Sequence, residues 1–238
     1  MALPNHGSVI VSGVAVCSNP RSNGRAITLD ANFYVDDDHS TPHTTYLTYW
    51  NKDDQTFDPV GIYYVTTTLT RITDTLPNKS KELKEVDYMA AGDIRKISAA
   101  GADAFVEEAP MMSISGAIIE IDETAGWFDL NPSQYASSLK DSKNKPTCPV
   151  RCVIQESKRW GDKGRPKMAP GYFVMVTGEM GRAVRDNEGK VLRFEIEVTD
   201  ISSLGRSVVP PPTTSAGTPA NKAFSYGNKP GKKRRLGE

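Results

Sequence analysis

The stretch VIVSGVAVC, residues 9–17, and the stretch MMSISGAIIEID, residues 111–122, decide the fold of this chain. Each is an apolar run rich in β-branched residues, which favours a β-strand. Each is interrupted by a Ser-Gly pair, at Gly13 in the first and at Gly116 in the second. Glycine inside a strand marks a sharp bend, because the missing Cβ lets the backbone kink. We therefore predict two strands of the same kind, each bent at its glycine.

Two further pairs of segments follow in the same order along the chain. FDPVGIYYVTTTLTRI, residues 57–72, corresponds to KMAPGYFVMVTGEMGR, residues 167–182, since both place Pro shortly before Gly and a strand-forming run. DYMAAGDIRKI, from residue 87, and RFEIEVTDISSL, from residue 193, share an Asp-Ile pair. The near-constant spacing predicts two copies of one β-unit, each about 100 residues long.

Each half supplies about five strands, which is the inventory of an OB-fold, a five-stranded Greek-key barrel. We predict an all-β chain with two tandem five-stranded OB-fold barrels, at residues 1–98 and 110–207, joined by a linker at 99–109. One short polar helix is expected at 78–86. Residues 208–238 are rich in Pro, Gly, Ser and Thr and should form a disordered basic tail. A single two-sheet β-sandwich is the alternative fold.

Over residues 9–17, 61–72, 171–181 and 193–204 the chain resembles the OB-folds of replication-protein-A-like and telomere-end-binding single-stranded-DNA proteins. The resemblance covers most of residues 8–204 and is one of architecture, since this fold has no signature motif. It implies a protein that binds single-stranded DNA.

Composition limits the classes of protein that the chain can represent. Of the 238 residues 24% are charged, the mean hydropathy is −0.45 and the formal net charge is zero. No apolar run approaches the roughly 18 residues of a membrane helix, and the first residues lack the features of a secretory signal. Three cysteines are an odd and low number, which favours a reducing compartment. We expect no membrane partner.

The zero net charge hides a gradient along the chain. Residues 1–108 hold 9 Lys and Arg against 15 Asp and Glu, residues 109–207 hold 14 against 13, and residues 208–238 hold 6 against 1. A polyanion would therefore meet a more favourable field in the C-terminal half.

Motifs for catalysis and for cofactors are missing from the sequence. It contains no Gly-x-Ser-x-Gly elbow, no Walker-type phosphate loop, no HExxH and no GxGxxG before a helix. The acidic run at 36–38 with His39 and His43 could be drawn as a metal site, but adjacent carboxylates in a polar loop more often form a solvated turn. We expect no enzyme activity, no cofactor and no bound metal.

Residues 157–167, SKRWGDKGRPK, are the strongest candidate for contact with nucleic acid. Cations bind phosphates and aromatic rings stack on bases, and this loop supplies both around Trp160. We expect the Trp160 ring to lie outside the core, and Arg151 to extend the basic track. The alternative is a basic loop that is only solvated. The cations of the loop are Lys158, Arg159, Lys163, Arg165 and Lys167.

The first half offers a smaller set of candidates. Tyr46 and Trp50 supply aromatic rings, and Arg21 and Arg25 flank the loop between the first two strands, a rim that OB-folds commonly use. The segment after Trp50, NKDDQ, is acidic. The alternative here is that the aromatic rings are half-buried sheet residues.

The end of the tail carries Lys232, Lys233, Arg234 and Arg235, a run typical of a nuclear localisation signal. A non-specific basic arm is the alternative. The sequence therefore predicts a nuclear protein whose partner is single-stranded DNA or RNA. The competing function is a protein–protein interaction scaffold in which the acidic first half docks protein partners, because the fold alone does not choose between these functions.

Overall fold

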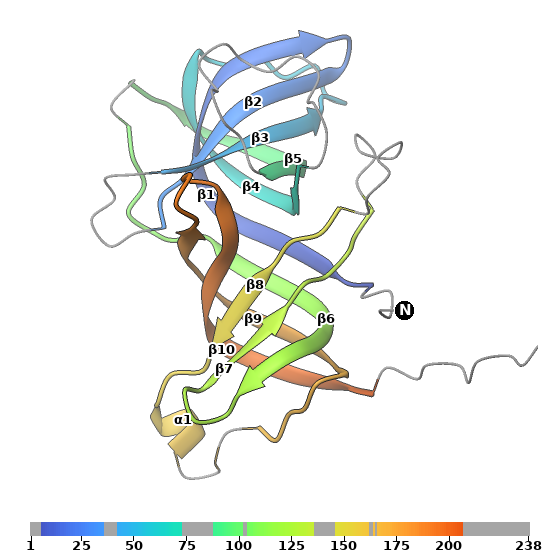
Figure 1. Cartoon of the computed structure of the whole chain (residues 1–238). Helices are drawn as coiled ribbons and strands as arrows, with labels where there is room; N and C mark the ends of the chain where they lie inside the picture. The colour runs from blue at the N-terminus through green and yellow to red at the C-terminus, as the bar shows by residue number, and fades with distance from the viewer. Residues whose placement is uncertain are drawn as a thin grey trace, which may run out of the picture. The chain divides into compact units, whose positions relative to one another are not determined.

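The structure of the chain is a computed structural model (Figure 1). The expected helix at 78–86, the acidic run at 36–38, His39 and the tail from residue 208 lie outside the described residues. No helix within the described part of the chain is long and apolar enough to cross a membrane. The structure describes residues 6–35, 42–72, 88–101, 104–135, 146–161, 164 and 166–206.

The first five strands close into a barrel. Strand β1 pairs with β2, β2 with β3, β3 runs parallel to β5, and β5 pairs with β4, which returns to β1. Alternate residues of each strand face the core, as expected for strands with one buried side. The strands are β1 (Ser8–Asn23), β2 (Ala26–Phe33), β3 (His43–Trp50), β4 (Val60–Arg71) and β5 (Tyr88–Ala99).

The second five strands close in the same order. Strand β6 pairs with β7, β7 with β8, β8 runs parallel to β10, and β10 pairs with β9, which returns to β6. The predicted fold class, all-β with two five-stranded OB-fold barrels, is confirmed, and the alternative β-sandwich is wrong. The elements are β6 (Met111–Asp122), β7 (Trp127–Leu130), β8 (Val150–Val153), α1 (Lys158–Gly161), β9 (Tyr172–Arg185) and β10 (Val191–Arg206).

The two barrels share one sheet, because β1 also pairs with β6. The antiparallel register places Ser8 opposite Ser115 and Ser12 opposite Met111. When the two halves are aligned at Gly13 and Gly116, Ser8 corresponds to Met111 and Ser12 corresponds to Ser115. Exchanging the corresponding residues of the two halves therefore gives the same β1–β6 pairing. The two serine hydroxyls of the first pair lie 3.0 Å apart. The result is a continuous ten-stranded sheet.

The segment predicted as a linker packs on the first barrel. Ala99 belongs to β5, and the Tyr34 hydroxyl donates a hydrogen bond of 3.1 Å to the carbonyl of Ala104. Val106 is buried. A Cβ on Gly13 would lie 2.8 Å from the Cα of Pro110. Gly13 is therefore required by the close approach of this segment.

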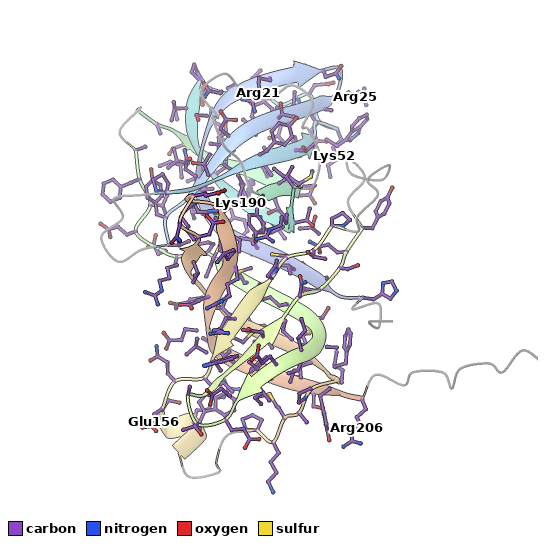
Figure 2. The ribbon with its side chains drawn as sticks, viewed as in Figure 1. Arg21, Arg25, Lys52, Glu156, Lys190 and Arg206 are labelled. Atoms are coloured by element: carbon purple, nitrogen blue, oxygen red, sulfur yellow. The ribbon has the colours of Figure 1, made fainter. Side chains whose placement is uncertain are left out.

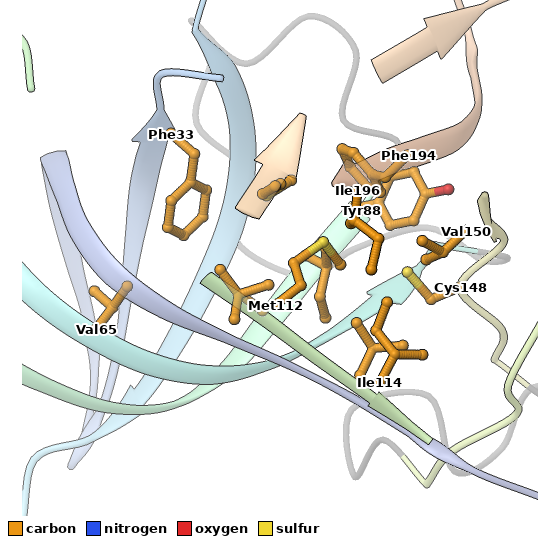
Figure 3. Packing of buried hydrophobic residues seen from close by; sticks show 14 of the residues in the cluster. Phe33, Val65, Tyr88, Met112, Ile114, Cys148, Val150, Phe194 and Ile196 are labelled. Atoms are coloured by element: carbon orange, nitrogen blue, oxygen red, sulfur yellow. The ribbon is translucent and has the colours of Figure 1, made fainter. Parts of the chain in front are cut away.

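One hydrophobic cluster extends through both barrels (Figure 3). Where they meet, the His43 ring contacts Tyr88 and Phe194 edge-on, at centroid distances of 5.8 and 4.7 Å. The cysteines are free and buried, as expected of small apolar fillers, and burial raises the pKa of Cys17 to about 12.

The loop expected between the first two strands, near Arg21 and Arg25, is mostly strand. Strand β1 continues to Asn23, with a shift in register between Ser18 and Arg21. Asn19 adopts a φ of 51°, and the bulge accommodates Pro20, which lacks a backbone N–H for the ladder. Only the turn at Gly24, with a φ of 63°, separates β1 from β2.

Candidate nucleic-acid interface

An exposed tryptophan stands at the end of β3, next to the β1–β2 turn. Trp50 is 62% exposed and lies on the outer face of the barrel, opposite Ala26 at the start of β2. Arg25 precedes Ala26, is exposed, and accepts a 2.8 Å hydrogen bond at its carbonyl from the Asn51 N–H. The exposed Lys52 follows. This corner, defined by Arg25, Trp50 and Lys52, combines one free aromatic face with two cations.

The end of β3 is held in place by a short polar turn. The Asn51 side chain accepts a hydrogen bond of 2.8 Å from the Gln55 N–H and donates one of 2.9 Å to the Gln55 carbonyl. The Gln55 side chain in turn donates to the Tyr49 hydroxyl at 3.1 Å. Trp50 therefore projects from a fixed backbone, which limits the entropy lost when its ring is used in binding.

Arg21 lies beside this corner but is already neutralised. Its guanidinium forms an ion pair of 2.6 Å with Asp30 and donates to the Asn19 carbonyl at 2.9 Å. It also lies 5.8 Å from the centroid of the Tyr46 ring. Figure 2 labels Arg21 with Arg25 and Lys52 in the first barrel.

Tyr46 does not offer a platform for a base. It is 2% exposed, and burial raises the pKa of its hydroxyl. The expectation that Tyr46 stacks on a base is wrong for this reason. Trp50, four residues further along the same strand, is the aromatic residue of β3 whose ring is open to solvent.

In the second barrel, Arg151 forms a cluster with Asp129 and Trp127 on the outer face. Its guanidinium makes two hydrogen bonds of 2.8 Å to the two carboxylate oxygens of Asp129, and it lies 3.5 Å from the centroid of the Trp127 ring. The hydrogen bond to Asp129 raises the pKa of Arg151, and the carboxylates of Glu195 and Glu120 add to the effect. Arg151 therefore does not extend a basic track.

Trp160 is positioned by α1 and packs against the hydrophobic core, which it covers as a partly buried residue. The Arg159 guanidinium lies 5.0 Å from its ring centroid and is bound to the Asp200 carboxylate and the Thr199 carbonyl. Trp160 is thus not a member of the buried cluster, but part of its ring is covered by the barrel. A tryptophan between charged residues of a short helix can bury one face against the barrel, and the sequence pattern alone does not reveal this.

The other predicted cations do not form a groove with Trp160 in the described structure. Lys167 is exposed and lines a pocket with two carboxylates, those of Asp122 and Glu123. The backbone of Lys158 is in α1, and its side chain is not described. Lys163, Arg165 and the run Lys232, Lys233, Arg234 and Arg235 lie outside the described residues.

Lys52 is the residue of the corner that the sequence pattern did not indicate as a binding residue. The aspartates of the segment NKDDQ argued against a binding role for Lys52. Its place two residues after a tryptophan was nevertheless a usable signal. Among the described residues, no group of three or more His, Cys, Asp and Glu side chains could hold a metal ion.

No protein-family model matches the chain, and no curated protein matches it. A deletion mutant of the single-stranded DNA binding protein from Thermus aquaticus is similar in structure, with 12% identity and a TM-score of 0.42, over 88% of this chain and 98% of that chain. The wild-type single-stranded DNA binding protein from Thermus aquaticus has 13% identity and a TM-score of 0.40, over 87% and 97%. Neither is a replication-protein-A-like or telomere-end-binding protein, so that finer resemblance stays a prediction. A function for this chain therefore has to come from its own residues.

Proposed function

We propose that the chain is a binding protein, not an enzyme, and that it binds single-stranded nucleic acid, DNA in the first place, at the corner formed by Arg25, Trp50 and Lys52. The observation that carries the proposal is the 62% exposure of Trp50 on the outer face of the first barrel, with two exposed cations, Arg25 and Lys52, near it at the end of the β2–β3 ladder. Every base has a π-face, so a free indole ring flanked by cations accepts unpaired bases without requiring one sequence.

Stacking should supply more of the affinity at this corner than charge does. Arg21 is neutralised by Asp30, and the exposed Asp53 and Asp54 follow Lys52 directly. Phosphate contacts provide the salt-dependent share of binding. We therefore expect a shallow dependence of the affinity on salt, set by about two phosphate contacts.

The test is a fluorescence-anisotropy titration of a labelled oligothymidine at two salt concentrations. Trp50→Ala should weaken binding by about 1–3 kcal/mol, the usual loss for one base stack, which is about five- to 150-fold. Trp160→Ala is the matched control, because it removes a tryptophan that packs on the core, and it should leave binding of the folded protein unchanged. Arg25→Ala should reduce the salt slope by about one contact. Absence of binding at low salt would overturn the proposal.

Three further points belong to the same proposal. The barrels end near the predicted limits, residues 1–98 and 110–207, with 99–109 between them. The protein acts in the nucleus, and removal of Lys232, Lys233, Arg234 and Arg235 should shift a tagged chain to the cytoplasm. Unchanged nuclear retention would contradict this last point. Binding of RNA, and docking of protein partners by the acidic first half, stay predictions.

A further inference from the structure

The outer face of β4 and β5 carries a second exposed aromatic ring beside a cation. Tyr64 of β4 is 47% exposed and lies directly opposite Arg95 of β5, which is also exposed. Both side chains are on the outer face, because the neighbouring Tyr63 and Ile94 are buried and successive side chains of a strand point to opposite faces. The first barrel therefore presents a ring and a cation together at a second place.

This second place is on the same surface as Trp50, since β5 lies between β3 and β4 (Figure 1). The pairing aligns Thr48 of β3 with Ala91 of β5, and Ala91 with Thr68 of β4. From this row, Trp50 is two residues along the sheet and Tyr64 is four residues along it in the same direction. A strand spacing of about 4.8 Å and a rise of about 3.4 Å per residue place their backbones roughly 12 Å apart.

One bound strand is long enough to reach both rings, because a single OB-fold usually covers about 4–16 nucleotides. The strand would cross β5 to do so. The backbone of that part of the sheet is fixed by the continuous ladder between β4 and β5. The two rings are thus held at a set distance before any ligand binds, which limits the entropy lost on binding.

Arg95 is available to a phosphate, whereas the cation next to it is not. Lys96 forms an ion pair with Asp58. Among the described residues, the Arg95 guanidinium has no such partner. The exposed Asp93, two residues before Arg95 on the same face of β5, adds a carboxylate to this surface. The charge of the surface is therefore a minor source of affinity, and the ring is the main one.

We propose that a single strand bound at the corner continues across β5, stacks a second base on Tyr64 and places a phosphate at Arg95. This inference rests on the function proposed above and gives the bound strand a path, which runs across the β-strands from β3 to β4. An aromatic ring accepts any base and an arginine contacts the backbone, so the second contact adds affinity without adding sequence preference.

The ring is tested with a labelled oligothymidine of about 16 nucleotides, the upper end of the site size of one OB-fold. Tyr64→Leu keeps an apolar side chain but has no π-face, so it should weaken binding about five- to 150-fold, the loss of one base stack. Tyr64→Phe keeps the ring and should bind like the parent. Thermal unfolding of each variant shows whether the fold is kept.

The charges are tested by the dependence of binding on salt. Arg95→Gln should reduce the salt slope by about one phosphate contact. Lys96→Gln is the matched control, because it removes the neighbouring cation that is already paired, and it should keep the slope of the parent. Asp93→Asn should strengthen binding at low salt, since it removes a charge of the same sign as the phosphates.

Trp50→Ala is measured alongside, so that the second contact and the corner are judged separately. Weaker binding by Trp50→Ala with equal binding by Tyr64→Leu and the parent would overturn the second contact and leave the corner in place. Weaker binding by Tyr64→Leu alone would overturn the corner, and with it the path that starts there. A parent that does not bind the oligothymidine at low salt would remove both.

A measurement on the unmodified chain does not depend on the variants. An oligothymidine that carries photoreactive 4-thiothymidine should cross-link to peptides that contain Trp50 and to peptides that contain Tyr64, at one oligonucleotide per chain. Cross-links to the Trp50 peptide without any to the Tyr64 peptide would overturn the proposal.

Discussion

His43 is the residue whose chemistry fits its surroundings least well. It is 3% exposed, packs edge-on against Tyr88 and Phe194, and neither ring nitrogen has a hydrogen-bond partner in the described structure. Burial, and then the nearby charge of Arg185, lowers the pKa of His43 to about 3. The folded chain thus stabilises the neutral form of the His43 ring.

The low pKa of His43 predicts a loss of stability in acid. Unfolded histidine has a pKa of about 6.5, so between about pH 6.5 and the folded value the unfolded chain binds more protons than the folded one. The contribution is complete above that range and is lost as the pH falls through it. His43→Leu should flatten the fall in melting temperature between about pH 7 and about pH 4.

The matched control for this measurement is His6→Gln, at an exposed histidine, which should keep the slope of the parent. An identical acid slope in His43→Leu and the parent would show that other groups cause the loss.

Gly13 gives a second prediction for a single residue. Because an added Cβ would lie 2.8 Å from both the Cα and the Cβ of Pro110, Gly13→Ala has to displace the backbone that crosses β1. Overpacking of this kind costs about 1–3 kcal/mol, which urea unfolding would measure. Ser12→Ala, one residue earlier on the strand, should cost much less. A rise in stability for Gly13→Ala would contradict the close approach.

Among the strands, β7 and β8 are the shortest, and one ion pair on their outer face ties them together. Arg151 and Asp129 are opposite residues of these strands, with side chains 20% and 21% exposed. Arg159 and Asp200 form a pair whose side chains are 55% and 56% exposed. Burial and two-point geometry strengthen an ion pair, and exposure weakens it.

We therefore expect Asp129→Asn to lower the free energy of unfolding by about 1–2 kcal/mol and Asp200→Asn to change it by less than about 0.5 kcal/mol. Chemical denaturation at low salt compares the two directly. Equal losses in both variants would mean that the Trp127–Arg151–Asp129 cluster adds nothing beyond a surface pair.

The elements were more predictable from the sequence than the site. Apolar runs rich in β-branched residues, repeated at a near-constant spacing, predicted the strands of both barrels, because strand propensity is a local property. The bulge at Asn19 was missed, since Pro20 and Gly24 together resemble a loop. The sequence favoured the loop around Trp160 over Trp50, whereas in the structure Trp50 is 62% exposed and Trp160 is partly buried. This order was not predictable because a ring's exposure depends on which distant segment covers it, and local sequence does not record that.

At the scale of the whole molecule, the barrels are joined by backbone pairing and by a shared core. Strand β1 is hydrogen-bonded to β6, and the buried cluster passes from Tyr88 to Phe194 without interruption. Neither barrel unfolds without exposing part of the other. We expect a single calorimetric transition with equal calorimetric and van't Hoff enthalpies.

Val174→Ala, in the core of the second barrel, should shift this whole transition to lower temperature. Two resolved transitions, or a shift of only part of the heat absorbed, would show that the barrels unfold separately.

The pairing of β1 with β6 also has a consequence for the order in which the ribosome delivers the chain. Residues 8–12 leave the exit tunnel long before residues 111–115, their partners on one side. Until then, the growing chain carries a strand edge with unpaired N–H and C=O groups, a template for pairing with other nascent chains. We expect ribosome-bound chains that expose only the first barrel to bind chaperones, and release to follow once β6 has emerged. Cross-linking of stalled chains of increasing length would measure that point.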